Sequence, residues 1–313
     1  MKNETESELT IFEPESNLIH PIDTVINLKN LLSQQLRNRG SGNEESFQNS
    51  IYNIADLLQA LCAKDKDAIV GSILLVPPVP YSVKHMLDTA SVVAIILRAM
   101  EVEPLTKRSI IAAALTMNTA MMNLQDSVQE KLGSLLREQQ QIIFNHPKMG
   151  SHLLEQSGVT DSTWLQTILQ HHECLNGTGY PYGLDQDQIC LGAKIVSVAD
   201  SYCSRVCPRG DRGNRNPTEV MREIYQDRGK IFDETCVDHL IKQIGLFPPG
   251  TCVELNSGED AIIVRQSNDL YRPLARRISK GKPDNNNIEV DIKSARMRPA
   301  FQVNFSFDPR ALW

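Results

Sequence analysis

The hydrophobic positions near the N-terminus recur at a helical spacing. Apolar residues return every three or four positions from Ile22 to Leu36 and again from Phe47 to Leu61, and Gly40-Ser41-Gly42 separates the two runs. This spacing places the apolar side chains on one face of a helix. We therefore expect an N-terminal helical hairpin within residues 21–80, after a flexible lead over residues 1–20. Its apolar face needs a cover, either the rest of the chain or a second subunit in a homodimer.

The hydrophobic period changes after Pro248-Pro249-Gly250, from about 3.6 residues to two. Apolar residues on either side of Asn256-Ser257-Gly258 then predict a hairpin with a tight turn over residues 253–264. One more alternating segment predicts a further strand, carried by Phe301, Val303 and Phe305.

These patterns together predict a mainly α protein. A helical bundle over residues 81–247 follows the N-terminal hairpin, and a small β appendage occupies residues 248–313.

The composition is that of an ordinary folded protein, with 41% hydrophobic residues among 313. Its 32 Lys and Arg against 38 Asp and Glu give a net charge of -6, which disfavours binding to a nucleic-acid polymer. No apolar run reaches the roughly 20 residues that a membrane helix needs, so we expect no membrane partner.

The seven cysteines form an odd set without a Cys-x-x-Cys pair. This pattern fits neither a disulfide framework nor a zinc ribbon. The residues from Met1 to Pro14 are polar and acidic, unlike a secretory signal. We therefore expect reduced thiols and a cytoplasmic location.

The segment with the clearest chemical pattern begins at His171-His172-Glu173. Neighbouring positions on a helix point about 100° apart, so two adjacent histidines can serve two metals, or a metal and a substrate. The following Gly177-Thr178-Gly179-Tyr180-Pro181 cannot continue a helix, because its glycines allow positive φ and its proline restricts the backbone. A rigid loop should follow the histidines.

Three further residues have the right chemistry for ligands. His85 lies near the start of a predicted helix, and His146 precedes Pro147, which suits a first helical turn. Asp200 ends an apolar run, where a carboxylate is costly unless a cation pairs with it. A metal-ligand role and a salt bridge each explain that position.

The order and spacing of these residues resemble the HD-GYP subgroup of the HD-domain metal-dependent phosphohydrolases, over about residues 81–246. The resemblance implies a helical bundle that holds a bi- or trinuclear iron or manganese centre and hydrolyses cyclic di-GMP. It implies five metal ligands here: His85, His146, His171, His172 and Asp200. It also implies that Gly177, Gly179, Tyr180 and Pro181 form the motif loop that gives the subgroup its name.

The chain departs from the family at the His-Asp dyad, where it has Met117 and Asn118. In the family, that aspartate bridges two metals, and a lysine at the position of Met121 helps to hold the substrate phosphate. A neutral amide and a soft thioether cannot replace these ligands beside two cations that repel each other. We expect one divalent cation, iron or manganese, rather than a full binuclear centre; Tyr81, where some members have glutamate, also argues against a third metal.

The resemblance also implies nucleotide-phosphate contacts at Arg209 and Arg212, in a basic loop after Asp200. Guanidinium groups match phosphate oxygens well. The alternative interpretation is a solvated basic loop without a ligand.

Three functional hypotheses follow. The first is a degenerate HD-GYP protein in cyclic di-GMP signalling, which binds the nucleotide, a protein partner through the Gly-Tyr-Pro loop, or both, with weak or no hydrolysis. The second is a working phosphodiesterase with an altered metal centre. The third is a helical interaction scaffold that binds neither metal nor nucleotide, so the sequence leaves open whether the protein is an enzyme.

Overall fold

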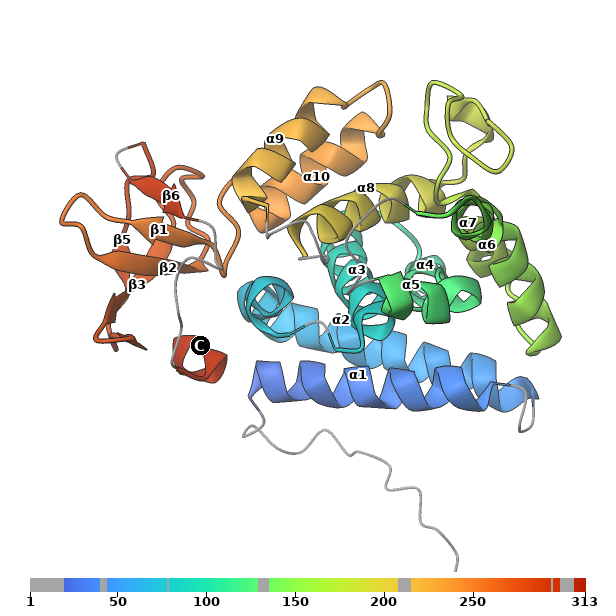
Figure 1. Ribbon diagram of the computed structural model, residues 1–313, viewed down its shortest axis with the longest axis horizontal. Coiled ribbons are helices and arrows are strands. Elements are labelled where there is room, and N and C mark those ends of the chain that lie inside the picture. The colour runs from blue at the N-terminus through green and yellow to red at the C-terminus, as the bar shows by residue number, and fades with distance from the viewer. Residues whose placement is uncertain are drawn as a thin grey trace, which may run out of the picture.

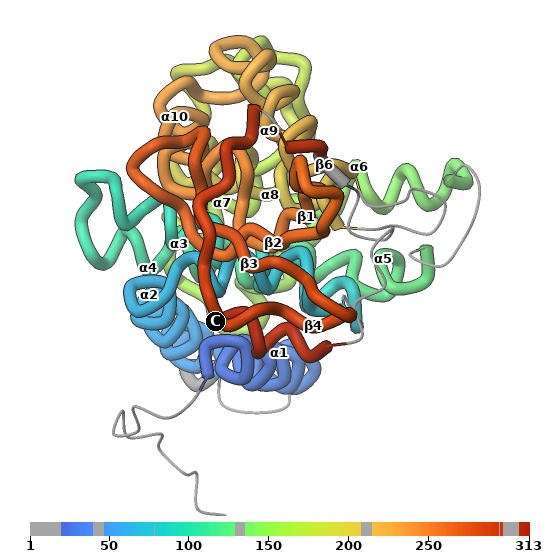
Figure 2. Tube along the Cα trace, turned by 90° about the vertical axis from the view of Figure 1, so that its left-hand side faces the viewer, coloured from blue at the N-terminus to red at the C-terminus, as the bar shows by residue number. Residues whose placement is uncertain are grey.

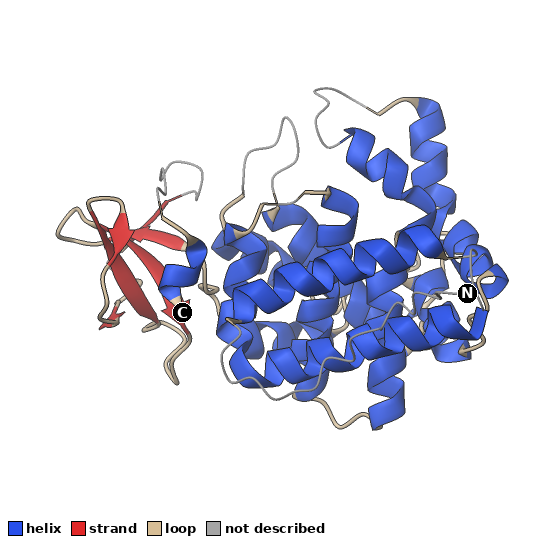
Figure 3. Cartoon of the chain, turned by 90° about the horizontal axis from the view of Figure 1, so that it is seen from below, coloured by secondary structure: helices blue, strands red, loops and turns tan. Residues whose placement is uncertain are grey.

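The computed structural model describes residues 20–39, 44–77, 79–128, 135–207, 215–293, 295–298 and 307–313. A helical body makes up most of the molecule, and a small sheet lies at one end of it (Figure 1; Figure 3). The predicted fold class, mainly helical with a C-terminal β appendage, is confirmed.

The N-terminal helices α1 (Pro21–Asn38) and α2 (Glu44–Leu75) run side by side along one edge of the helical body (Figure 1). His20 caps α1 by accepting a hydrogen bond from the backbone N–H of Ile22, and Pro21 occupies the first helical position. The apolar stripes of both helices are buried in the main core, so the chain's own helices cover them. A homodimer stays a prediction.

The central helix of the body is α3 (Tyr81–Arg98), which is buried from Tyr81 to Leu97. Around it pack α2, α8 and α4, with smaller contacts from α5, α1 and α10. The remaining helices in the described part of the chain are α4 (Pro104–Thr116), η1 (Thr119–Met121), α5 (Met122–Val128), α6 (Arg137–Gln156), α7 (Ser162–Gln170), η2 (Gln186–Gln188), α8 (Leu191–Val206), α9 (Pro217–Gln226), α10 (Glu234–Ile244) and η4 (Pro309–Leu312).

The β appendage is an antiparallel sheet in the order β4-β3-β2-β1-β6, with β5 pairing with β3. Its strands are β1 (Cys252–Glu254), β2 (Asp260–Arg265), β3 (Leu274–Ser279), β4 (Lys282–Pro283), β5 (Ile288–Glu289) and β6 (Arg296–Arg298). Figure 2 shows this sheet in front of the helical body.

The predicted hairpin is confirmed as β1 and β2, in which Val253 pairs with Ala261. Gly258 in the turn has φ +82°, a conformation that glycine adopts at little cost. The strand predicted from Phe301, Val303 and Phe305 lies outside the described residues.

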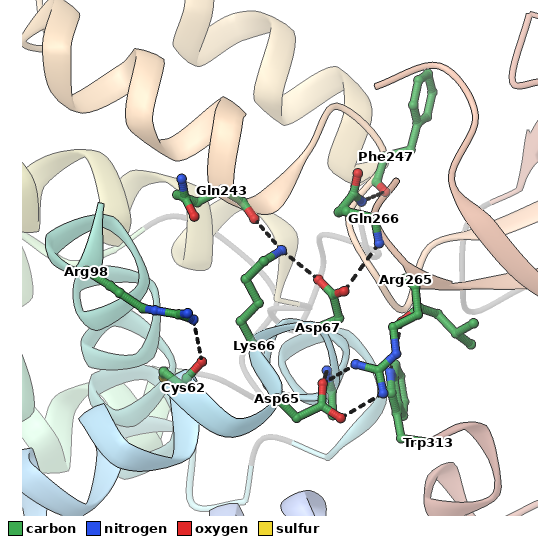
Figure 4. Close-up of polar contacts among 12 residues, drawn as sticks. Cys62, Asp65, Lys66, Asp67, Arg98, Gln243, Phe247, Arg265, Gln266 and Trp313 are labelled. Atoms are coloured by element: carbon green, nitrogen blue, oxygen red, sulfur yellow. Dashed lines mark hydrogen bonds and ion pairs between the residues drawn. The ribbon is translucent and has the colours of Figure 1, made fainter. Parts of the chain in front are cut away.

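Polar contacts join the appendage to α2 at a break in that helix (Figure 4). Asp65 leaves helical geometry, at φ -153° and ψ 79°, and accepts two hydrogen bonds from the guanidinium of Arg265 on β2. Lys66 donates to the carbonyl of Gln243 at 2.9 Å. Trp313 donates its indole N–H to the carbonyl of Val264 at 2.9 Å, and its ring lies against Gly71.

Among the described residues, no helix is long and apolar enough to cross a membrane. All seven cysteines fall in the described part of the chain, and none of them forms a disulfide there.

Candidate metal centre

Three histidines, one from a helix interior and two from the end of another helix, lie together in the bundle. His146 is inside α6, His171 terminates α7 and His172 follows it directly. One ring nitrogen from each lies within 4.8 Å of the others, so the three side chains could hold a metal ion. His146 and His171 are fully buried, whereas His172 is partly exposed and gives the cluster a side open to solvent.

Hydrogen bonds to the backbone set the orientation of two of these rings. Nδ1 of His146 donates to the carbonyl of Ile143 at 2.5 Å, and Nδ1 of His171 donates to the carbonyl of Ile168 at 2.6 Å. A neutral imidazole carries one proton, so both Nε2 atoms then present lone pairs. These two Nε2 atoms are 3.2 Å apart. Two facing lone pairs at this distance repel unless a proton or a cation lies between them.

The other two predicted ligands form a pair of their own. His85, on α3, donates from Nε2 to Oδ1 of Asp200, on α8, at 2.7 Å. The side chain of Asp200 is 13% exposed and that of His85 is buried. The charge of Asp200 also acts on all three clustered histidines, and His85 acts on His171 and His172. The structure therefore brings three of the five residues together as a cluster and pairs the other two with each other, near enough for their charges to act on the cluster.

Burial controls the protonation of the cluster. It lowers the pKa of His146 to about 3, with a further contribution from the adjacent His171. Burial likewise lowers the pKa of His171 and His172. Although burial opposes the ionisation of Asp200, its hydrogen bond with His85 holds the carboxyl pKa well below the usual range. At neutral pH the centre is three neutral imidazoles beside a carboxylate, the protonation state that binds metal.

The Gly-Tyr-Pro loop is held against this centre by Glu173. Its carboxylate accepts hydrogen bonds from the backbone N–H groups of Tyr182, at 2.8 Å, and Leu184, at 2.9 Å. Gly179 packs so closely that a Cβ there would collide with the backbone of residues 173–174. The ring of Tyr180 stacks on His172, with 4.6 Å between centroids.

This loop also contacts the N-terminal half of α6. Phe144 stacks on the outer side of the loop against Tyr180, with 5.3 Å between centroids. Sequence reasoning missed the roles of Glu173 and Phe144. Glu173 stood within the recognised motif, but nothing in the spacing of Phe144 distinguished it from an ordinary exposed apolar residue.

The departures from the family motif lie next to α6. Met117 caps α4 and is fully buried, and its carbonyl oxygen is 3.6 Å from the place that a Cβ on Gly150 would occupy, one turn after His146. Asn118 is 1% exposed. Its Oδ1 has no hydrogen-bond partner among the described residues, and neither has Nδ1 of His85. Both are acceptors that a donor or a cation would satisfy.

The predicted phosphate ligands Arg209 and Arg212 lie outside the described residues. The arginines that flank this segment, Arg205 and Arg215, both pair with Glu223 on α9. The phosphate-binding role of Arg209 and Arg212 therefore stays a prediction.

The donor set fits a divalent metal. Buried imidazoles with second nitrogens bonded to backbone carbonyls are the arrangement that metal-ligating histidines usually show. Imidazole donors suit iron and zinc, whereas manganese prefers oxygen. Three histidines near one carboxylate could therefore hold one divalent cation, and the choice between iron and manganese stays a prediction.

Comparison with known proteins adds family information to this geometry. Residues 74–236 match the HD domain family. Cyclic di-GMP phosphodiesterase PA4108 of Pseudomonas aeruginosa is 26% identical over 215 residues, which are 68% of this chain and 51% of that protein. PdeB of Borreliella burgdorferi, also named a cyclic di-GMP phosphodiesterase, is 26% identical over 216 residues, 68% of this chain and 57% of that protein. The chain thus spans a little over half the length of these two relatives.

A third relative and one solved structure are also similar to this chain. The cyclic di-GMP phosphodiesterase response regulator RpfG of Xanthomonas campestris pv. campestris is 33% identical over 123 residues, 38% of this chain and 32% of that protein. The HDG"Y"P protein Bd1817 of Bdellovibrio bacteriovorus has a similar fold, with a TM-score of 0.61, 17% identity and coverage of 74% of each chain.

Proposed function

The chain belongs to the HD-GYP subgroup of the HD-domain family, and from this premise we propose that it acts in cyclic di-GMP signalling by binding the nucleotide, with weak or no hydrolysis. One observation carries the proposal. The histidine cluster is assembled, while Met117 and Asn118 occupy the positions of the family's His-Asp dyad.

The cluster of His146, His171 and His172 holds a single cation in this proposal, with Asp200 as the nearby anion. When bound, the cation supplies positive charge for a phosphate oxygen and acidifies a water molecule. A second cation close by would need an anionic bridge to offset the repulsion between the metals. Asn118 provides a neutral amide there, and Met117 provides a thioether, so the second position has little affinity.

The chain's own groups favour binding over turnover. Arg209 and Arg212 supply the guanidinium contacts to phosphate, and the partly exposed His172 marks the side from which a ligand approaches. The family's phosphate-holding lysine is replaced by Met121, which is 8% exposed and uncharged. Ground-state binding that the transition state does not strengthen lowers the dissociation constant without accelerating hydrolysis.

The test is a titration of the iron-loaded full chain with cyclic di-GMP, followed by chromatography of the nucleotide after a long incubation. We expect saturable binding and recovery of intact cyclic di-GMP. Multiple turnovers to linear dinucleotide or GMP would establish a working phosphodiesterase instead. The absence of both binding and turnover would leave the scaffold hypothesis.

A pair of histidine variants on the same helix provides the control. His146→Ala removes a member of the cluster and should abolish metal retention. It should also weaken nucleotide binding by at least tenfold, because the contact between the cation and the phosphate is lost with the metal. His152→Ala alters an exposed histidine two turns further along α6 and should leave both unchanged.

A further inference from the structure

A second pocket, separate from the metal centre, opens between α1 and the HD-domain helices. Its volume is about 500 Å³, and α1, the start of α3, η1, α5 and α6 all contribute to its walls. None of the five candidate metal-centre residues lines it. This volume falls within the range of sites for small organic molecules.

The charge of the pocket wall is predominantly positive. Arg37 and Arg39 line it from the end of α1. In the described part of the chain, neither arginine forms an ion pair, and Arg39 donates only to the carbonyl of Leu36, at 2.6 Å. Both arginines therefore line the pocket with most of their guanidinium N–H donors not engaged by other described residues.

The carboxylate of Asp126 is the acidic group that lines the pocket, and it is already engaged. Its two oxygens accept hydrogen bonds from the backbone N–H and the hydroxyl of Ser82, at 2.8 and 2.9 Å, in the first turn of α3. A carboxylate at a helix N-terminus is partly compensated by the helix dipole. Because both Ser82 donors are uncharged, Asp126 keeps its negative charge, and two arginines with one aspartate leave the wall with a formal charge of +1.

The rest of the wall mixes apolar with uncharged polar side chains. Leu36 and Val83 are buried, and Leu153 is partly exposed toward the pocket side of α6. Met122 and Met149 add flexible thioether side chains, which adapt to ligands of different shape. A cavity that combines apolar side chains with charged donors at one side is suited to orient a small ligand by its polar group.

We propose that this pocket binds a small organic anion, with its apolar body against Met122, Met149 and Leu153 and its phosphate or carboxylate group held by Arg37 and Arg39. Arginine pairs with either group through two parallel hydrogen bonds. Both arginines precede residues 74–236, so the site combines the N-terminal helices with the HD domain rather than belonging to the domain alone. The proposal is independent of metal binding and of cyclic di-GMP.

The test is a fluorescence titration of the full chain with 8-anilinonaphthalene-1-sulfonate, an apolar dye that carries one anionic group. We expect saturable binding at one site. The double variant Arg37→Gln, Arg39→Gln should raise the dissociation constant by about tenfold or more, because charge-assisted hydrogen bonds are lost. The exposed Arg222 on α9 gives the matched control, and Arg222→Gln should leave the dissociation constant unchanged.

Two further measurements make the outcome decisive. N-phenyl-1-naphthylamine, which has the same apolar body without the charge, should bind at least about tenfold more weakly. Ser33→Trp fills the pocket from the partly exposed face of α1 and should abolish dye binding while the circular dichroism spectrum stays native. Equal affinity for both dyes, or affinity unchanged in both pocket variants, overturns the proposal.

Competition then identifies the anionic group. Displacement of the dye by octanoate assigns a carboxylate ligand, and displacement by phenyl phosphate assigns a phosphate ligand. Displacement by neither compound overturns the proposal.

Discussion

At the scale of single residues, the candidate metal centre depends on which nitrogen of each histidine is protonated. Backbone carbonyls accept the Nδ1 protons of His146 and His171, which leaves the two Nε2 atoms facing each other at 3.2 Å. This arrangement is unfavourable without a cation and favourable with one. Because the buried histidines are neutral, the stability of the metal-free protein should depend on pH.

The metal-free protein should lose stability as the pH falls. Burial lowers the pKa of His146 to about 3, below the value of about 6.5 for an exposed histidine. Between these values the unfolded state binds the proton and the folded state does not, so the free energy of unfolding decreases with decreasing pH. One such histidine contributes up to about 1.4 kcal/mol per pH unit. Urea denaturation between pH 7.5 and 4.5, with chelator present, measures this slope.

Two variants on α6 isolate the contribution of His146. His146→Gln should flatten the slope of stability against pH, whereas His152→Gln, at an exposed position, should leave the slope as it is. An identical slope in wild-type protein and His146→Gln would contradict the assignment of a neutral His146 in the folded state.

At the scale of elements, the contiguous features were predictable from sequence and the long-range ones were not. The β1–β2 hairpin followed from alternation around Asn256-Ser257-Gly258, and the rigid loop followed from the glycines after His172. The apolar spacing marked the second helix from Phe47 to Leu61 but did not show that the helix continues to Leu75, across a break at Asp65. Arg265, 200 residues away, holds that break, and no local pattern signals such a partner.

The same distinction applies to the candidate site. His171 and His172 are adjacent in sequence, so the sequence alone predicts that they lie close together at a helix end. The bond between His85 and Asp200 joins residues 115 positions apart and depends on the packing of α3 against α8. Sequence order suggested both residues as ligands, but it could not show that they pair with each other.

The Gly-Tyr-Pro loop should tolerate no side chain at its second glycine. Gly179→Ala places a methyl group into the backbone of residues 173–174, so the loop has to move and Tyr180 should lose its stacking on His172. We expect a destabilisation of about 2 to 4 kcal/mol by urea denaturation, as for other severe steric conflicts.

A second glycine variant separates this steric conflict from backbone strain. Gly258 has positive φ, but a Cβ at this position would meet no atom within 4 Å, so Gly258→Ala should cost only about 1 kcal/mol. Equal losses for Gly179→Ala and Gly258→Ala would show that the loop does not pack on residues 173–174 as described.

At the scale of the whole molecule, the β appendage is joined to the helical body through α2. Trp313 lies against Gly71 and bonds to the carbonyl of Val264, while Arg265 pairs with Asp65 (Figure 4). Helix and sheet residues therefore share one interface. The effect of a substitution on α2 on the stability of the protein should depend on which residue occupies position 313.

A double-mutant cycle tests that dependence. Gly71→Ala alone should destabilise the protein, because the new methyl group collides with the ring of Trp313. In the Trp313→Ala background the same change should be neutral or stabilising by up to about 1 kcal/mol, since alanine favours a helix over glycine. Thermal unfolding of the four proteins measures the coupling. Additive effects would contradict the contact between Trp313 and α2.

The metal stoichiometry of the anaerobically reconstituted protein tests the central claim most directly. After loading with iron(II) and removal of free metal, we expect one iron per chain in the wild-type protein. Restoring the family residues, by Met117→His, Asn118→Asp and Met121→Lys together, should raise this to two, because the aspartate supplies the anionic bridge. Two irons in the wild-type chain, or none, would contradict the account of a single-cation centre built on His146, His171 and His172.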